Sequence, residues 1–174
     1  MSERSQAEAV SFIERFAQSE QFETLFREGM SLVEETADYL DGQGRKEARG
    51  LKPPMSVIYA TESMRLTTRL LEVASWLVVQ RALKDGDISR NEADEKRARV
   101  KLRTMTRPSH IRMFDELPEG LKSLISRSFA VTDRLSQIDK AMQADQAEVS
   151  ALNPVADQMK RLASAFGMGS RATH

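Results

Sequence analysis

The sequence contains no cysteine and only two histidines, His110 and His174. Without cysteine, the chain can form neither disulfides nor thiolate metal sites, and it lacks a cysteine nucleophile. With so few histidines, a multi-histidine metal centre or a histidine-based catalytic triad is hard to assemble. These shortages point away from an enzyme.

Recognisable catalytic motifs are also missing. The sequence has no HExxH, no Glu-x-x-His pair, no phosphate-binding glycine loop, and no GxSxG or GxGxxG pattern. Di-iron bundles, P-loop enzymes and serine hydrolases are therefore poor fits. We predict a protein that has no catalytic activity and no bound cofactor or metal.

The chain lacks a charge excess of either sign and a long apolar run. Its 174 residues include 26 basic and 26 acidic side chains, and 40% are hydrophobic, which is typical of one soluble domain. The longest nearly uncharged apolar stretch, 73–79, is far shorter than the ~20 residues needed to cross a membrane. Residues 1–16 lack the apolar core of a secretory signal. We therefore expect a soluble, cytoplasmic protein.

Glycine and proline are concentrated at a few junctions, and the long blocks between them are typical of helices. Apolar residues three and four apart predict an amphipathic helix over 19–41, with Ser19 as its N-cap and Gly42 and Gly44 at its exit. Residues 41–54 are predicted to form a polar loop, closed by Pro53 and Pro54.

A second helix is predicted over 55–84. Its second half is apolar on nearly every side, which predicts that it is covered from more than one direction. The apolar residues of that half are Leu70, Leu71, Val73, Ala74, Trp76, Leu77, Val78 and Val79.

The remaining segments complete an all-α prediction. A short, largely solvated helix is predicted over 89–103, because Ser89 and Glu92 have the spacing of a capping box. A third amphipathic stripe begins near Pro118 and extends to Met142. We predict an antiparallel three-helix bundle over 19–144, preceded by an N-terminal segment, 1–18, and followed by a flexible tail, 145–174.

The tail contains one amphipathic segment. Val155, Met159, Leu162 and Phe166 would share one face of a short helix that begins at Asn153 and Pro154. Such a helix could dock on a partner, or it could fold back and cover a seam of the bundle.

A row of charged residues marks the long helix. Glu62, Arg65, Arg69 and Glu72 follow one another at spacings of three, four and three, and the row continues to Trp76. One interpretation is structural: a solvated stripe, or a partly buried network that determines helix register. The other is a recognition surface centred on Trp76 and the arginines, which are residue types favoured at interface hot spots.

A basic run lies between residues 96 and 112. Its members are Lys96, Arg97, Arg99, Lys101, Arg103, Arg107 and Arg112, with no acidic residue between them. The run could bind phosphate, but acidic residues precede it and no aromatic side chain lies within it. Nucleic-acid binding is therefore a secondary hypothesis, and a structural homodimer that pairs exposed helix faces is another.

Three longer strings resemble one known family. They are FREGMSLVEETADYLDGQGR at 26–45, ESMRLTTRLLEVASWLVVQRAL at 62–83 and LPEGLKSLISRSFAVTDRLSQID at 117–139. Together they resemble the RcdA family, the regulators of CtrA degradation in alphaproteobacteria. The middle string is the most specific, and the N-terminal and C-terminal residues contribute little.

The resemblance implies an adaptor rather than an enzyme. Members of this family are expected to form a three-helix bundle with a flexible C-terminal tail, and to deliver cell-cycle regulators such as CtrA to the ClpXP protease. ClpX is primed by a CpdR-like protein, and a cyclic-di-GMP-binding adaptor, PopA, attaches in the CtrA branch. The nucleotide dependence belongs to that partner, so the resemblance implies no cofactor for this chain. The candidate partner-binding residues come from surface chemistry: Arg65, Arg69, Trp76, Val155, Met159, Leu162 and Phe166.

Overall fold

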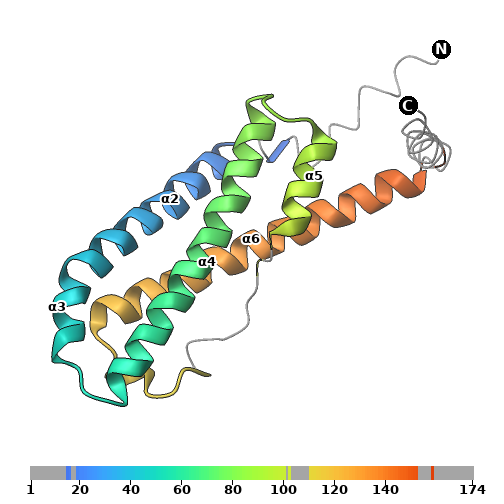
Figure 1. The fold of residues 1–174 in the computed structure, drawn as a ribbon. Helices are drawn as coiled ribbons and strands as arrows, with labels where there is room; N and C mark the ends of the chain where they lie inside the picture. Colours follow the sequence, from blue (N-terminus) through green and yellow to red (C-terminus); the bar gives the residue numbers. More distant parts are fainter. Residues whose placement is uncertain (1–14, 17–18, 101, 103–109, 153–157, 159–174) are drawn as a thin grey trace, which may run out of the picture. The chain divides into compact units, whose positions relative to one another are not determined.

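The computed structural model describes residues 15–16, 19–100, 102, 110–152 and 158, and its regular structure there is helical (Figure 1). The helices are α2 (Glu20–Asp41), α3 (Gln43–Gly50), α4 (Met55–Lys84), α5 (Arg90–Arg99), the 3-10 helix η2 (Phe114–Glu116) and α6 (Glu119–Leu152). The predicted all-α class is confirmed. In this part of the chain, no helix is both long and apolar enough to cross a membrane.

The chain divides into two compact units, residues 1–137 and 138–174, and the boundary falls inside α6. The first unit contains α2, α4 and the first part of α6, which are the three long helices expected from the apolar stripes. Ser19 caps α2 as predicted, since its hydroxyl accepts a hydrogen bond from the backbone N–H of Phe22 at 3.3 Å.

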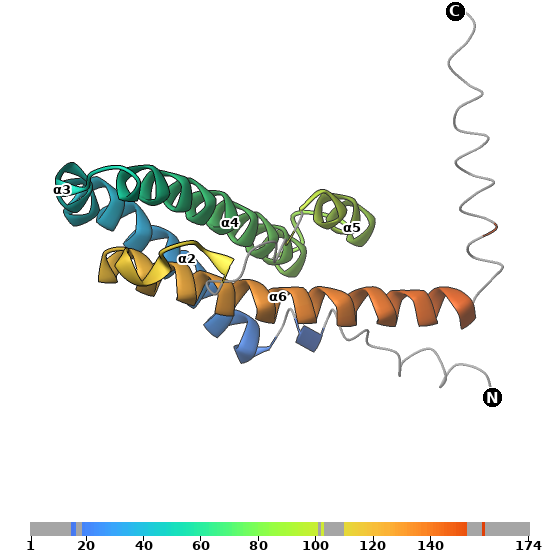
Figure 2. The ribbon, with the colours of Figure 1, turned by 90° about the horizontal axis from the view of Figure 1, so that it is seen from below.

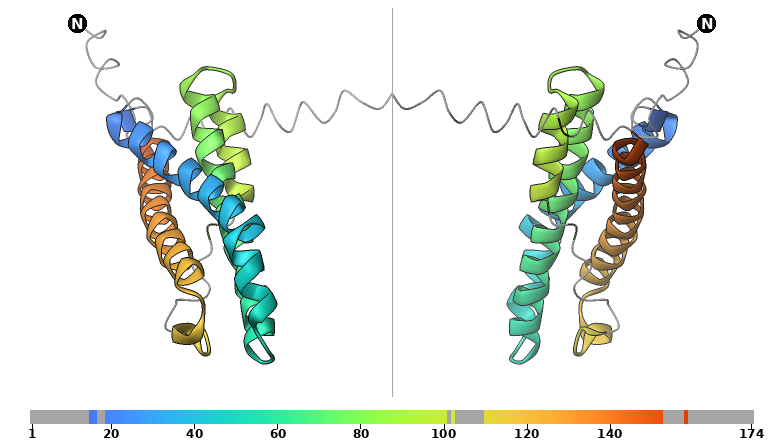
Figure 3. Two further views of the ribbon diagram at one scale, coloured as in Figure 1. Left: turned by 90° about the vertical axis from the view of Figure 1, so that its left-hand side faces the viewer. Right: turned by 90° about the vertical axis from the view of Figure 1, so that its right-hand side faces the viewer.

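Within the first unit, α2 runs antiparallel to both of the other long helices. Glu28 forms an ion pair with Arg134, whereas Glu35 forms one with Arg127, so residue numbers rise along α2 as they fall along α6. The chain turns through α3 into α4, and it then runs back along α5 (Figures 1 and 3). As a result, α4 and the first part of α6 point in the same direction.

The core of the first unit is built from one side of each long helix. Its fully buried side chains include Phe22, Leu32, Leu66, Val73, Trp76, Leu77, Gln80, Leu121, Ile125 and Leu135. Two buried hydroxyls are satisfied inside α6, where Ser128 donates to the carbonyl of Ile125 at 2.7 Å and Thr132 donates to that of Ser128 at 2.8 Å. The apolar periodicity of the sequence therefore identified the inward sides of α2 and of the first part of α6 correctly.

The prediction of a polar loop over 41–54 is wrong. Most of this segment forms the helix α3, which lies beside the start of α4 (Figure 2). Good helix formers separate the glycines and sustain two turns. Gly44 is buried inside α3, and a Cβ there would lie 2.6 Å from Tyr59 Oη and 2.9 Å from the carbonyl oxygen of Tyr39. Tyr39 also donates a hydrogen bond to Glu47 Oε2 at 2.6 Å, which ties α3 to α2. Gly44 thus permits close packing and does not mark a turn.

Two further helices, α5 and α6, end at residues other than those predicted from the sequence. The short solvated helix is confirmed as α5, capped by Ser89, whose hydroxyl accepts from the N–H of Glu92 at 3.3 Å, but it ends at Arg99. Helix α6 continues to Leu152, eight residues past Ala144, where the bundle segment was predicted to end. Residues 145–152 include alanine, glutamine, glutamate and leucine, which favour a helix.

Ion pairs on the surface link α2 to both neighbouring helices. Glu23 pairs with Arg81 at 2.9 Å and with Lys84, and the Arg81 guanidinium lies 4.7 Å from the centre of the Phe26 ring. Hydrogen bonds from Lys84 and Arg81 lower the pKa of the Glu23 carboxyl. On the other side, the hydrogen bond from Arg127 lowers the pKa of Glu35.

Replacing Gly44 with alanine tests the close packing of α3. We expect Gly44→Ala to lower the free energy of unfolding by about 1–3 kcal/mol, since the new methyl group overpacks two tyrosines and a carbonyl. Gly50→Ala, in the same helix, is the matched control because nothing lies within 4 Å of its Cβ. Gly50→Ala should leave the free energy of unfolding unchanged or raise it by up to ~1 kcal/mol. Urea unfolding followed by circular dichroism measures both, and equal losses would contradict the packing.

A pH series tests the pair of Glu35 with Arg127. Because the pKa of Glu35 is lowered in the folded state, the pair stabilises the fold above the ordinary glutamate pKa and ceases to do so as pH falls through the lowered value. Glu35→Gln should therefore lower the free energy of unfolding by about 0.2–1 kcal/mol at pH 7 and by less in acid. Glu34→Gln, at the neighbouring exposed position, is the control. A loss for Glu35→Gln that stays constant with pH would contradict the pairing.

Candidate functional site

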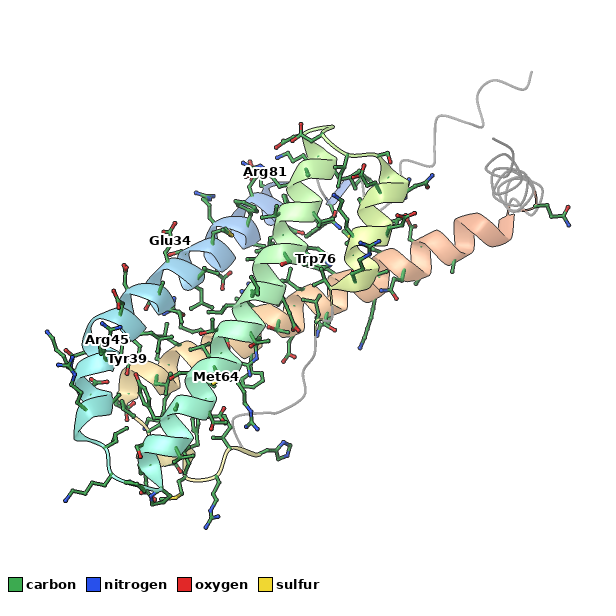
Figure 4. All side chains as sticks on the ribbon, in the orientation of Figure 1. Glu34, Tyr39, Arg45, Met64, Trp76 and Arg81 are labelled. Carbon is green, nitrogen blue, oxygen red and sulfur yellow. The ribbon has the colours of Figure 1, made fainter. Side chains whose placement is uncertain are left out.

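The charged row on α4 is partly inside the protein. Glu62 and Arg69 are buried, whereas Arg65 is exposed. Trp76, which is labelled on α4 in Figure 4, has no exposed surface. The hypothesis of a recognition surface centred on Trp76 is therefore corrected, since a partner cannot reach a side chain enclosed in the core. The partly buried network, the other interpretation of the row, fits the structure.

Arg69 joins α4 to α6. Its Nη1 donates a hydrogen bond to Ser128 Oγ at 2.8 Å, and its guanidinium carbon lies 3.7 Å from the centre of the Phe129 ring. Burial lowers the pKa of Arg69 below its ordinary value, and the charge of Glu62 opposes that shift. Arg69 therefore acts in packing and is not available as a surface contact.

Arg65 is the member of the row that a partner could contact. Its Nη1 lies 2.7 Å from Glu62 Oε1, and 53% of its side chain is exposed. The guanidinium has five donors, so this pair leaves others for a further acceptor. A partner-binding role for Arg65 stays a prediction.

The basic run does not form an unopposed basic surface where the structure describes it. Lys96 pairs with Glu92 at 3.1 Å, and Arg97, which is buried, pairs with Asp94 at 2.5 Å. Arg99 and Arg112 are exposed. The other three members, Lys101, Arg103 and Arg107, lie outside the described residues, as do Val155, Met159, Leu162 and Phe166 of the tail. Phosphate binding is not favoured by this arrangement, because acidic side chains of α5 itself offset its cations.

A surface that the sequence reasoning missed lies on the outward side of α4. Val57, Met64, Leu71 and Val78 are 63%, 72%, 67% and 51% exposed, and consecutive members are seven residues apart. Leu71 and Val78 were expected to be buried, but both are exposed. The seven-residue spacing, visible in the sequence, was the signal that could have identified this stripe.

Small residues fill the positions between these large ones. Ala60, Thr61, Thr67 and Thr68 are exposed, while Ala74 and Ser75 are half-buried. We call the surface made by these ten residues the outer face of α4: Val57, Ala60, Thr61, Met64, Thr67, Thr68, Leu71, Ala74, Ser75 and Val78.

The hydroxyl groups of the outer face are already used inside α4. Thr61, Thr67, Thr68 and Ser75 each donate to the backbone carbonyl four residues earlier, at 2.8, 2.9, 3.0 and 2.7 Å. The face therefore offers methyl groups and apolar side chains over most of its length, with no charged residue among its members. Apolar surface of this extent is typical of a protein-protein contact.

Among the described residues, no group of three histidine, aspartate or glutamate side chains could hold a metal ion. The candidate site is therefore taken from the exposed apolar surface described above. Its described parts are the outer face of α4 and the adjoining Arg65.

Comparison with known proteins agrees with this picture. Residues 13–166 match a family described as "Protein of unknown function (DUF1465)". The crystal structure of RcdA from Caulobacter crescentus shares 44% sequence identity, with a TM-score of 0.61, over 74% of this chain and 96% of that chain. The chain belongs to the RcdA family. No curated protein matches it. The family expected from the three sequence strings is thus confirmed, and the RcdA-family fold accounts for the helices described above.

Removing Arg69 tests whether it acts in packing. We expect Arg69→Ala to lower the free energy of unfolding by about 3 kcal/mol, because it removes the hydrogen bond to Ser128 and the contact with the Phe129 ring and leaves a cavity between α4 and α6. Arg45→Ala is the control, since Arg45 pairs with Asp41 on the surface, and it should cost less than ~1 kcal/mol. Chemical unfolding gives both values. Similar losses for the two variants would show that Arg69 is not held in the core.

Proposed function

We propose that this protein is a non-enzymatic adaptor that delivers cell-cycle regulators, such as CtrA-type cargo, to the ClpXP protease in the cytoplasm. The observation that supports this most is the 44% identity to RcdA over 96% of that chain. The exposed apolar outer face of α4 also supports the proposal, because apolar surface of this kind is common at protein-protein contacts.

An adaptor needs two separate binding surfaces, because it raises the local concentration of cargo at the enzyme without new chemistry. The helical bundle supplies one surface. In this proposal, the segment that carries Val155, Met159, Leu162 and Phe166 supplies the other. Arg65 lies beside the outer face of α4 and contributes a charge there.

The partners follow from the family. ClpX, primed by a CpdR-like protein, would hold the adaptor, and a PopA-like adaptor would attach to it for CtrA-type cargo. Any nucleotide dependence would belong to PopA, so the proposal requires no cofactor on this chain. Nucleic acid has no role in this proposal, consistent with the ion pairs within α5.

A degradation assay tests the proposal. Purified ClpXP, the CpdR-like protein and a candidate cargo are combined with and without this protein, and cargo loss is followed on a gel. Cargo should disappear faster with this protein, and only when the CpdR-like protein is present. If the rate is unchanged and primed ClpX does not retain this protein in a pull-down, the proposed function is wrong.

Variants of the tail test the second surface in the same assay. Met159→Asp with Leu162→Asp should reduce the acceleration of cargo loss about tenfold or more, since charges disrupt an apolar anchor. Gln158→Asp adds charge at a neighbouring exposed position and should have little effect. The melting temperature should stay the same for both. If it falls for Met159→Asp with Leu162→Asp, the segment covers a seam of the bundle instead.

A further inference from the structure

Four basic side chains are exposed on the short helix α3 and just after it. Helix α3 forms the corner between α2 and α4 (Figure 1). Its inward positions, Gly44, Glu47 and Ala48, are buried or half-buried, and the positions between and after them are exposed. We call the exposed cations of this segment the basic patch of α3: Arg45, Lys46, Arg49 and Lys52.

The basic patch of α3 is mostly not neutralised by this chain. Arg45 forms an ion pair with Asp41 at 3.3 Å, and 62% of its side chain stays exposed. With the residues that the structure describes, the other three cations form no ion pair. The acidic residue within α3, Glu47, does not offset them, because it accepts hydrogen bonds from Tyr39 at 2.6 Å and from Gln43 at 3.0 Å.

Repulsion within the patch favours an acidic ligand. Arg45 and Arg49 are four residues apart on α3, and Lys46 and Arg49 are three apart. Like charges at these spacings lie on neighbouring turns and destabilise a helix. Carboxylates bound between these side chains would replace that repulsion with attraction, and an arginine can bind a carboxylate with two parallel hydrogen bonds.

Close packing holds the patch in one position. The Tyr39 hydroxyl donates to Glu47, which ties α3 to α2. A Cβ on Gly44 would lie 2.6 Å from Tyr59 Oη, so α3 also lies directly against α4. A Cβ on Gly120 would lie 2.5 Å from the Tyr39 ring, which places the start of α6 against the same tyrosine. A ligand therefore meets cations whose backbone is already ordered, which lowers the entropic cost of binding.

The surface beside the patch limits the kind of ligand. Along α2, the exposed residues that precede α3 include Glu34, Asp38 and Asp41. A nucleic acid carries charge along its whole length and would be repelled by these carboxylates wherever it extended over α2. A short protein segment with a few neighbouring acidic residues can contact α3 without crossing them.

We propose that the basic patch of α3 binds a short acidic segment of another protein. Carboxylates of that segment pair with Arg45 and Arg49, and Lys46 and Lys52 add charge at either side. The inference goes beyond the proposed adaptor function and does not depend on it, because α3 is a different segment from the tail and from the outer face of α4, and its test contains no protease.

Fluorescence anisotropy tests the proposal with the full chain and a fluorescein-labelled peptide, Gly-Gly-Glu-Glu-Glu-Glu-Gly-Gly. The peptide should bind, and less tightly as salt rises, because salt screens exposed charges. Lys46→Glu with Arg49→Glu should raise the dissociation constant by about tenfold or more, since two attractions become repulsions. Arg27→Glu with Arg99→Glu, at exposed positions on α2 and α5, changes the net charge equally and should raise it by about threefold or less.

The melting temperatures of both double variants should stay close to that of the wild type, because all four side chains are exposed. Equal losses of binding for the two variants would show that only the net charge matters and would overturn the proposal. Absence of peptide binding to the wild type, even at low salt, would overturn it as well.

An NMR titration with the same peptide tests the location. The largest amide shifts should fall within residues 45–52, whereas largest shifts within α5 would overturn the proposal. An oligothymidylate with the same number of charges distinguishes the class of ligand. It should bind more weakly than the peptide, and tighter binding at residues 45–52 would assign the patch to nucleic acid instead.

Discussion

Burial of one side of α4 holds the first unit together. Trp76, Leu66, Val73 and Leu77 are enclosed there with the inward residues of α2 and α6. Each such side chain contributes about 1.5–3 kcal/mol when it leaves water, so this side of one helix accounts for a large part of the driving force for folding. The positions of α2, α3 and α5 are arranged around it.

A buried cation then determines how α4 meets α6. Arg69 has its hydrogen bond to Ser128 and its contact with the Phe129 ring only when these two helices are in one register. A buried charge adds little net stability compared with an apolar replacement, but a shifted register would leave it without partners. Burial of apolar side chains therefore supplies the free energy of folding, and Arg69 determines the register between α4 and α6.

The long helices could be predicted from the sequence because their apolar spacing is regular, and Ser19 and Ser89 are typical N-caps that mark the starts of α2 and of the short helix α5. Helix α3 could not be predicted, because the sequence alone does not distinguish a glycine that allows close packing, as Gly44 does, from a glycine that marks a turn. Burial of Trp76 was missed for a related reason, since tryptophan is favoured both in cores and at interfaces. Exposure of Leu71 was missed because an apolar pattern does not show which sides of a helix the rest of the chain covers.

The central claim is that α4 has two apolar sides, one buried by α2 and α6 and the other, the outer face of α4, exposed on this chain. Met64 lies in the middle of the second side and can report on it directly. In the full chain with ¹³C-labelled methionine methyl groups, a soluble gadolinium chelate should broaden the resonance of the exposed Met64 strongly and that of the buried Met142 little. Equal broadening of the two resonances would contradict the account.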